Sequence, residues 1–147
     1  MYQNLIQLFE ATVSACPENL ALADREESFT FAALRENARK LASILLKKGL
    51  GGKVLAVLAR HDVWTPLLFL GVLYAGGAYV PLDEEMPAEK QKKILEGSGA
   101  AAILCHGESD HGHLPVTKEL LNEVCCEETA LKEAEANLLC LSMCTAM

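Results

Sequence analysis

The stretch VLAVLARHDVWTPLLFLGVLYAGGAYVPLD, residues 54–83, decides the fold of this chain. Residues 54–59 are apolar at every position, which is typical of a strand covered on both faces, as in a parallel sheet. Residues 62–75 predict a helix with Asp62 as its cap, and a glycine pair separates it from a second buried strand at 78–82. A strand, a helix and a strand of this length form a parallel unit with a right-handed crossover.

The residues before this unit predict two helices and a hairpin. Pro17 ends a first helix, in which apolar residues recur at helical spacing. Two short strands at 20–24 and 28–31 flank a charged turn and predict the hairpin. Thr30 can cap a long second helix, and Gly49 can close that helix in a left-handed turn.

The residues after the unit predict another helix and strand, followed by a less regular region. In chain order we expect a helix opened by Pro87 and ended at Gly97 and Gly99, a buried strand at 100–105, a polar loop at 106–113, a short strand at 114–116, a short helix at 118–124, an acidic segment at 127–137 and a last strand at 138–143. The whole chain is therefore predicted as one α/β unit, a mostly parallel sheet with flanking helices.

Composition excludes several classes of function. The net charge is −7 and the 13 basic residues form no long run, so a nucleic-acid partner is not expected. Residues 63–82 carry no charge, but Pro66 and several glycines interrupt them, and we expect no membrane span. The start of the chain lacks the pattern of a signal peptide, and the six cysteines form no CxxC pair. These features favour a cytoplasmic protein with reduced thiols.

Two segments resemble a known enzyme family. LGVLYAGGAYVPLDEEMPAEKQKKILEGSGAAAILC, residues 70–105, and FTFAALRENARKLASILLKKGL, residues 29–50, resemble the adenylate-forming (AMP-binding) enzymes. Within that family the chain is most similar to the amino-acid adenylation domains of nonribosomal peptide synthetases. The resemblance implies that residues 1–147 are a partial N-terminal subdomain, an incomplete N-terminal portion of the adenylate-forming fold.

The resemblance also implies a reaction and its cofactors. The complete enzyme would join a carboxylate to the α-phosphate of ATP, with magnesium, and release pyrophosphate. In the family a Ser/Thr/Gly-rich phosphate loop, an adenine-stacking aromatic residue, a ribose-binding acid and a lysine in a C-terminal lid follow later in the chain, and none has a counterpart here. We therefore assign no residue a catalytic, cofactor-binding or metal-binding role, and expect a truncated adenylation domain that is inactive alone.

Four local features have a functional and a structural interpretation. The three histidines of residues 106–113 could bind a metal, but a solvated loop also explains them. The glycines of 49–52 precede a strand, so they lack the geometry of a phosphate loop. Cys140 and Cys144 are too far apart along a strand for a disulfide. The apolar stripe at 34–46 could be a partner surface, although core packing is the favoured interpretation.

Two other functions stay open at this point. The chain could be a non-catalytic interaction module that docks on a synthetase or a carrier protein. It could also be a small α/β protein that binds a nucleotide at its strand ends. The expected partners of the favoured hypothesis are the remainder of the adenylation domain or a carrier protein.

Overall fold

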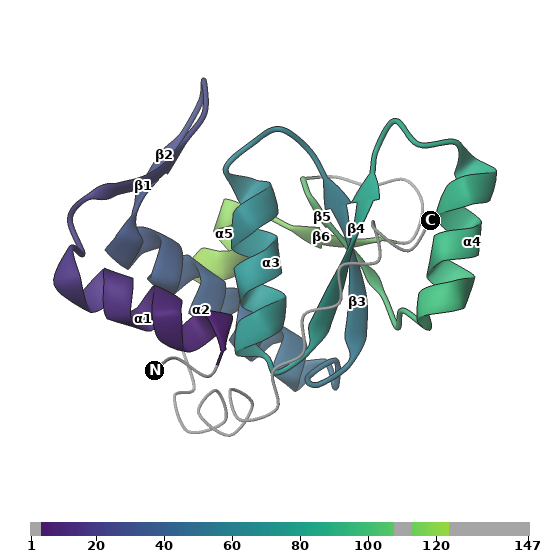
Figure 1. Ribbon diagram of the computed structural model, residues 1–147, viewed down its shortest axis with the longest axis horizontal. Helices are drawn as coiled ribbons and strands as arrows, with labels where there is room; N and C mark the ends of the chain where they lie inside the picture. The colour runs from purple at the N-terminus through teal and green to yellow at the C-terminus, as the bar shows by residue number, and fades with distance from the viewer. Residues whose placement is uncertain (1–3, 108–112, 124–147) are drawn as a thin grey trace.

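A computed structural model describes residues 4–107 and 113–123 of the chain (Figure 1). The helices are α1 (Leu5–Ala15), α2 (Phe31–Lys47), α3 (Trp64–Tyr74), α4 (Ala88–Ser98) and α5 (Lys118–Asn122), and the strands are β1 (Leu20–Ala23), β2 (Ser28–Thr30), β3 (Val54–Ala59), β4 (Ala78–Asp83), β5 (Ile103–His106) and β6 (Leu114–Val116). The predicted last strand at 138–143 and the acidic segment at 127–137 lie outside the described residues.

The predicted α/β fold is confirmed. Strands β4, β3, β5 and β6 form one sheet in that order, and every neighbouring pair is parallel. Strands β1 and β2 form the predicted antiparallel hairpin. Helix α4 covers one face of the sheet, while α2, α3 and α5 lie on the other and α1 packs outside them (Figure 1).

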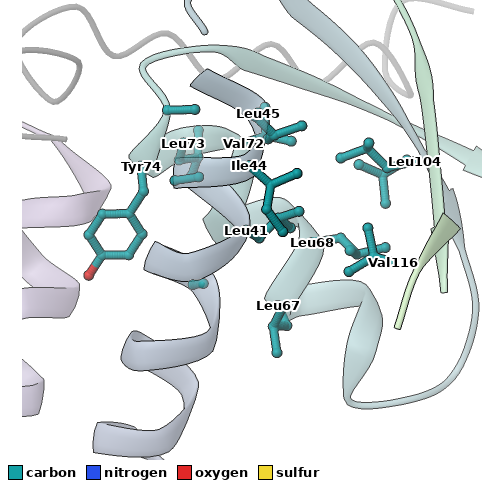
Figure 2. Packing of buried hydrophobic residues seen from close by; sticks show 14 of the residues in the cluster. Leu41, Ile44, Leu45, Leu67, Leu68, Val72, Leu73, Tyr74, Leu104 and Val116 are labelled. Carbon is teal, nitrogen blue, oxygen red and sulfur yellow. The ribbon is translucent and has the colours of Figure 1, made fainter. Parts of the chain in front are cut away.

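Most of the apolar side chains are buried between α2, α3 and the sheet (Figure 2). The stripe at 34–46 lies on this side of α2: Leu34, Ala38, Leu41, Ala42 and Leu45 are at most 4% exposed. Burial of that stripe confirms that it is core, and the interpretation as a partner surface is wrong. A second, smaller cluster joins β3 and β4 to Ile94 of α4.

Several element ends differ from the sequence prediction. Helix α3 begins at Trp64, two residues later than expected. Residues 60–63 form the bend that takes the chain from the end of β3 to the face of the sheet where α3 lies. Helix α4 continues through Gly97, and only Gly99, with φ +69°, ends it in a left-handed conformation. Strand β5 begins at Ile103, three residues later than expected, although Ala101 and Ala102 already form backbone hydrogen bonds with Val54 and Ala56 of β3.

The uncharged stretch at 63–82 divides between two elements, as predicted. Residues 64–74 form α3, and the bend at 75–77 leads into β4. In the described part of the chain, no helix has both the length and the apolar character needed to cross a bilayer.

Helix α1 is attached to the other helices by a polar cluster that the sequence did not indicate. The Tyr74 hydroxyl, fully buried on α3, donates a hydrogen bond to Glu10 of α1. Arg35 of α2 donates from Nε to both Glu10 carboxylate oxygens, at 2.8 and 2.9 Å. The Arg39 guanidinium lies 3.8 Å from Glu10 and 5.7 Å from the centre of the Tyr74 ring. Figure 2 shows the Tyr74 side chain pointing away from the strands that carry Leu104 and Val116.

This cluster predicts a loss of stability in alkaline solution. Burial, and then the hydrogen bond to Glu10, raise the pKa of Tyr74 far above its ordinary value of 10.0. The unfolded chain therefore loses this proton first, so the stability contribution is complete below about pH 9 and declines above about pH 10, by up to about 1.4 kcal/mol per pH unit. Urea unfolding of the Tyr74→Phe variant and the parent should give a stability difference that shrinks above about pH 10. A stability difference between the two proteins that does not change with pH would contradict the raised pKa of Tyr74.

Candidate functional site at the carboxyl ends of the strands

The connections after β3 and β4 leave the sheet on opposite faces. Helix α3 follows β3 on the α2 face, and α4 follows β4 on the other face (Figure 1). In open α/β sheets the crevice outside the carboxyl ends at such a point is where ligands bind. A cavity of about 490 Å³ lies there, lined by Ala59, Arg60, His61, Pro81, Asp83, Glu84, Glu85 and Met86. This cavity, called the carboxyl-end cleft below, is the candidate site.

Arg60, the first residue after β3, links the ends of three strands. Its Nε donates to Glu84 Oε2, beyond β4, at 2.9 Å, and its Nη1 donates to the His106 carbonyl oxygen of β5, also at 2.9 Å. Its backbone N–H donates to the Thr65 hydroxyl oxygen at 2.9 Å. The ion pair between Arg60 and Glu84 is partly exposed, so on its own it contributes about 0–1 kcal/mol to the stability of the fold. Its main effect is to hold the loops around the cleft in one geometry.

The start of α3 is held from two sides. Asp62 Oδ1 accepts hydrogen bonds from the Thr65 N–H at 3.0 Å and from its hydroxyl at 3.1 Å, so the predicted capping contact of Asp62 is present although the helix begins later. Asp24, in the hairpin turn, accepts from the Val63 N–H at 3.0 Å. This hydrogen bond first, and then those from Glu27 and Glu26, lower the pKa of Asp24.

Trp64 connects the hairpin to the sheet. Its indole Nε1 donates to Glu27 Oε2 at 2.8 Å, and Phe29 of β2 meets its ring edge to face at 5.8 Å. On its other side the indole stacks on the His106 imidazole at 4.0 Å, with 7° between the planes. His106 Nδ1 lies 3.0 Å from the Val116 carbonyl oxygen of β6. The hairpin thus packs firmly against the carboxyl ends of the strands.

The charge of the cleft is mostly negative. Asp83, Glu84 and Glu85 line it, and the Arg60 guanidinium already pairs with Glu84. A second hollow of about 680 Å³ adjoins it at His61 and is lined by residues 23–26 and 61–62. Within residues 4–107 and 113–123, no group of three His, Cys, Asp or Glu side chains is arranged to hold a metal ion.

The structure also places the features that had two interpretations. Of the histidine-rich segment, His106 is in β5 against Trp64, whereas residues 108–112 lie outside the described chain. The glycines of 49–52 form the turn before β3, at the end of the strand opposite the cleft. Cys140 and Cys144 lie outside the described residues. Sequence reasoning missed Arg60 and Trp64, although an arginine directly after a buried strand is the signal that could have found the first.

Comparison with protein families gives a match over most of the chain. The family model described as AMP-binding enzyme matches residues 9–142. Tyrocidine synthase 3 of Brevibacillus parabrevis is 41% identical over 103 residues, which are 69% of this chain and 2% of that protein. Bacitracin synthase 3 of Bacillus licheniformis is 35% identical over 113 residues, 76% of this chain and 2% of that protein. Gramicidin S synthase 1 of Brevibacillus brevis is 39% identical over 99 residues, 67% of this chain and 9% of that protein. The chain thus spans less than a tenth of each of these three relatives.

Solved structures share the fold. The AMPPNP-bound form of the nonribosomal peptide synthetase FmoA3 superposes with a TM-score of 0.69 at 22% identity, over 80% of this chain and 14% of that one. The N-terminal subdomain of Klebsiella oxytoca NpsA gives a TM-score of 0.70 at 18% identity, over 84% of this chain and 34% of that one. At these identities the likeness establishes the fold alone.

Proposed function

This chain belongs to the AMP-binding enzyme family, and we propose that it forms the N-terminal part of an amino-acid adenylation domain of a peptide synthetase. The observation that carries the proposal is the 34–41% identity to peptide synthases over at least two-thirds of the chain. In the complete domain an amino-acid carboxylate oxygen would attack the α-phosphorus of ATP, and pyrophosphate would leave. Residues 1–147 would supply the frame against which the reacting groups are held.

The described cleft supports a framework role over a catalytic one. ATP brings a triphosphate, which needs backbone N–H groups, cations or a bound metal around it. Among the described residues that line the cleft, Asp83, Glu84 and Glu85 oppose a single guanidinium, which Glu84 already engages. Such a set repels phosphate, so these residues alone do not fit ATP, and we derive no catalytic step from them. We propose that ATP and magnesium bind only to the complete enzyme.

Partners and compartment follow from the same proposal. The remainder of the adenylation domain would pack against this chain, and a carrier protein would receive the activated amino acid. We also place the protein in the cytoplasm, because Cys16 and Cys105 are free thiols that are not joined in a disulfide.

The test is an ATP–pyrophosphate exchange assay with each proteinogenic amino acid. The 147-residue chain alone should give no exchange above a protein-free blank, whereas the whole synthetase that contains it should respond to one or a few amino acids. Exchange by the chain alone would overturn the framework role. A containing protein that shows no exchange, but from which the chain captures a carrier protein, would instead favour the interaction module.

A further inference from the structure

The turn end of the β1–β2 hairpin is attached to the start of α3. Asp24 Oδ2 accepts a hydrogen bond from the Val63 N–H at 3.0 Å. Glu27 Oε2 accepts one from the Trp64 indole N–H at 2.8 Å, and Phe29 packs edge to face against the Trp64 ring. A two-stranded hairpin is at best marginally stable by itself in water. The order of the turn end therefore depends on the position of Trp64.

The end of β5 extends beyond its pairing with β3. That pairing ends at Leu104, so the last two residues of β5 lie past it. On the β3 side, Arg60 Nη1 donates to the His106 carbonyl oxygen at 2.9 Å, and on the other side His106 pairs with Val116 of β6. The Trp64 indole stacks on the His106 ring at 4.0 Å. The position of His106 therefore depends on Arg60, β6 and Trp64 together.

The guanidinium of Arg60 is held weakly by its other side-chain contact. The side chains of Arg60 and Glu84 are 32% and 51% exposed, so water screens the attraction between them. The geometry of the guanidinium at the cleft thus depends on the His106 carbonyl oxygen. The hairpin and Arg60 are therefore two weakly held parts that share one support, the stacked pair of Trp64 and His106.

We propose that the hairpin, the Trp64–His106 stack and Arg60 form one cooperative unit, so that release of the hairpin also opens the carboxyl-end cleft. Local openings in proteins involve contiguous groups whose contacts support one another. A hairpin that leaves Trp64 takes away both the carboxylate of Glu27 and the ring of Phe29. The indole then no longer holds the His106 ring, and the carbonyl oxygen that fixes Arg60 loses its place.

This opening would leave the sheet itself intact. Strands β3 and β4 are joined by six residue pairs, and Val57 and Val80 within them are fully buried. The residues that line the cleft come from the ends of β3 and β4 and the loops after them, so the hairpin would control the shape of the cleft without lining it. The proposal does not depend on the proposed enzymatic function, and it would hold for an interaction module as well.

Proton exchange with water in a Phe29→Ala variant of the full 147-residue chain, followed by NMR, tests the proposal. Two N–H groups report on the cleft side: the Gly107 backbone N–H, which donates to a carbonyl oxygen of β6 at 3.2 Å, and the Arg60 Nε–H. Both should exchange at least about fivefold faster than in the parent. The Ala56 backbone N–H, which is hydrogen-bonded within the sheet, should keep the parental rate.

Phe31→Ala is the matched control. Phe31, the first residue of α2, is partly buried like Phe29, but it packs against Phe9 of α1. The same loss of a ring there should leave the exchange rates of Gly107 and Arg60 near those of the parent. Equal acceleration in both variants would trace the effect to a general loss of stability and would overturn the proposal.

Faster exchange confined to the indole N–H of Trp64, the single tryptophan, would mean that the hairpin opens by itself, which also overturns the proposal. If Phe29→Ala unfolds the chain, so that the sheet N–H exchanges rapidly too, the opposite direction decides, because coupling is reciprocal. Glu84→Gln removes the carboxylate that pairs with Arg60. Relative to Glu85→Gln, a matched change in the same cleft, it should speed the exchange of the Trp64 indole N–H about twofold. Equal rates in these two variants would refute the cooperative unit.

Discussion

Replacing Gly77 with alanine is expected to lower the free energy of unfolding by about 2–4 kcal/mol. Gly77 lies in the bend between α3 and β4, where its N–H donates to the Val72 carbonyl oxygen at 3.1 Å. A Cβ at this position would overlap the Lys53 carbonyl oxygen and would lie 3.3 Å from Val72 Cγ1. The Lys53 oxygen belongs to the backbone and accepts the hydrogen bond from Ala78 that starts the β3–β4 ladder, so it cannot move without weakening the sheet.

The measurement is urea unfolding of the variant and the parent, with Gly97→Ala as the matched control. Gly97 is inside α4, and a Cβ there meets no atom within 4 Å. Alanine should therefore stabilise the helix at this position, by about 0.5–1 kcal/mol. If Gly77→Ala lowers the free energy of unfolding and Gly97→Ala raises it, the loss at Gly77 is due to the overlap with the Lys53 carbonyl oxygen and not to a general effect of alanine. A Gly77→Ala variant as stable as the parent would show that the bend has room for a side chain.

Replacing Glu10 with alanine should also destabilise the chain by about 2–4 kcal/mol. Glu10 is the carboxylate on which the Tyr74 hydroxyl, Arg35 and Arg39 converge. Tyr74 is fully buried and Arg39 is 5% exposed, so both would lose this partner in a place that water hardly reaches. The Glu10 side chain is itself 29% exposed, which places the expected loss in the lower half of the range.

Glu36→Ala provides the control for charge and helix propensity. Glu36 pairs with Lys40 one turn along α2 at 3.4 Å, and its side chain is 65% exposed. Its removal should cost less than about 0.5 kcal/mol. Thermal or urea unfolding that gave equal losses for the Glu10 and Glu36 variants would refute the structural role of the cluster. A Glu10→Gln variant keeps an acceptor for the Tyr74 hydroxyl, so its loss of stability should lie between those of the Glu10→Ala and Glu36→Ala variants.

The order and type of the elements could be predicted because local physics sets them. The uniformly apolar run of β3 needs cover on both faces, and the capping hydroxyl of Thr30 accepts from the Ala33 N–H at 3.1 Å, as the sequence indicates. The element ends were less predictable. Gly97 resembles a helix stop in sequence, but a glycine in a helical conformation continues the hydrogen bonding of α4, and only the left-handed Gly99 ends it.

The sequence by itself determined the fold class, the buried stripe of α2 and the resemblance to the AMP-binding enzymes, because all three depend on patterns of neighbouring residues. Only the tertiary structure decided the composition of the candidate site. Arg60 meets Glu84 and the His106 carbonyl, 24 and 46 residues away, and Trp64 meets Glu27 from the hairpin. Such contacts arise where parallel strands bring distant loops to one edge of a sheet, and no local periodicity encodes which loops meet there.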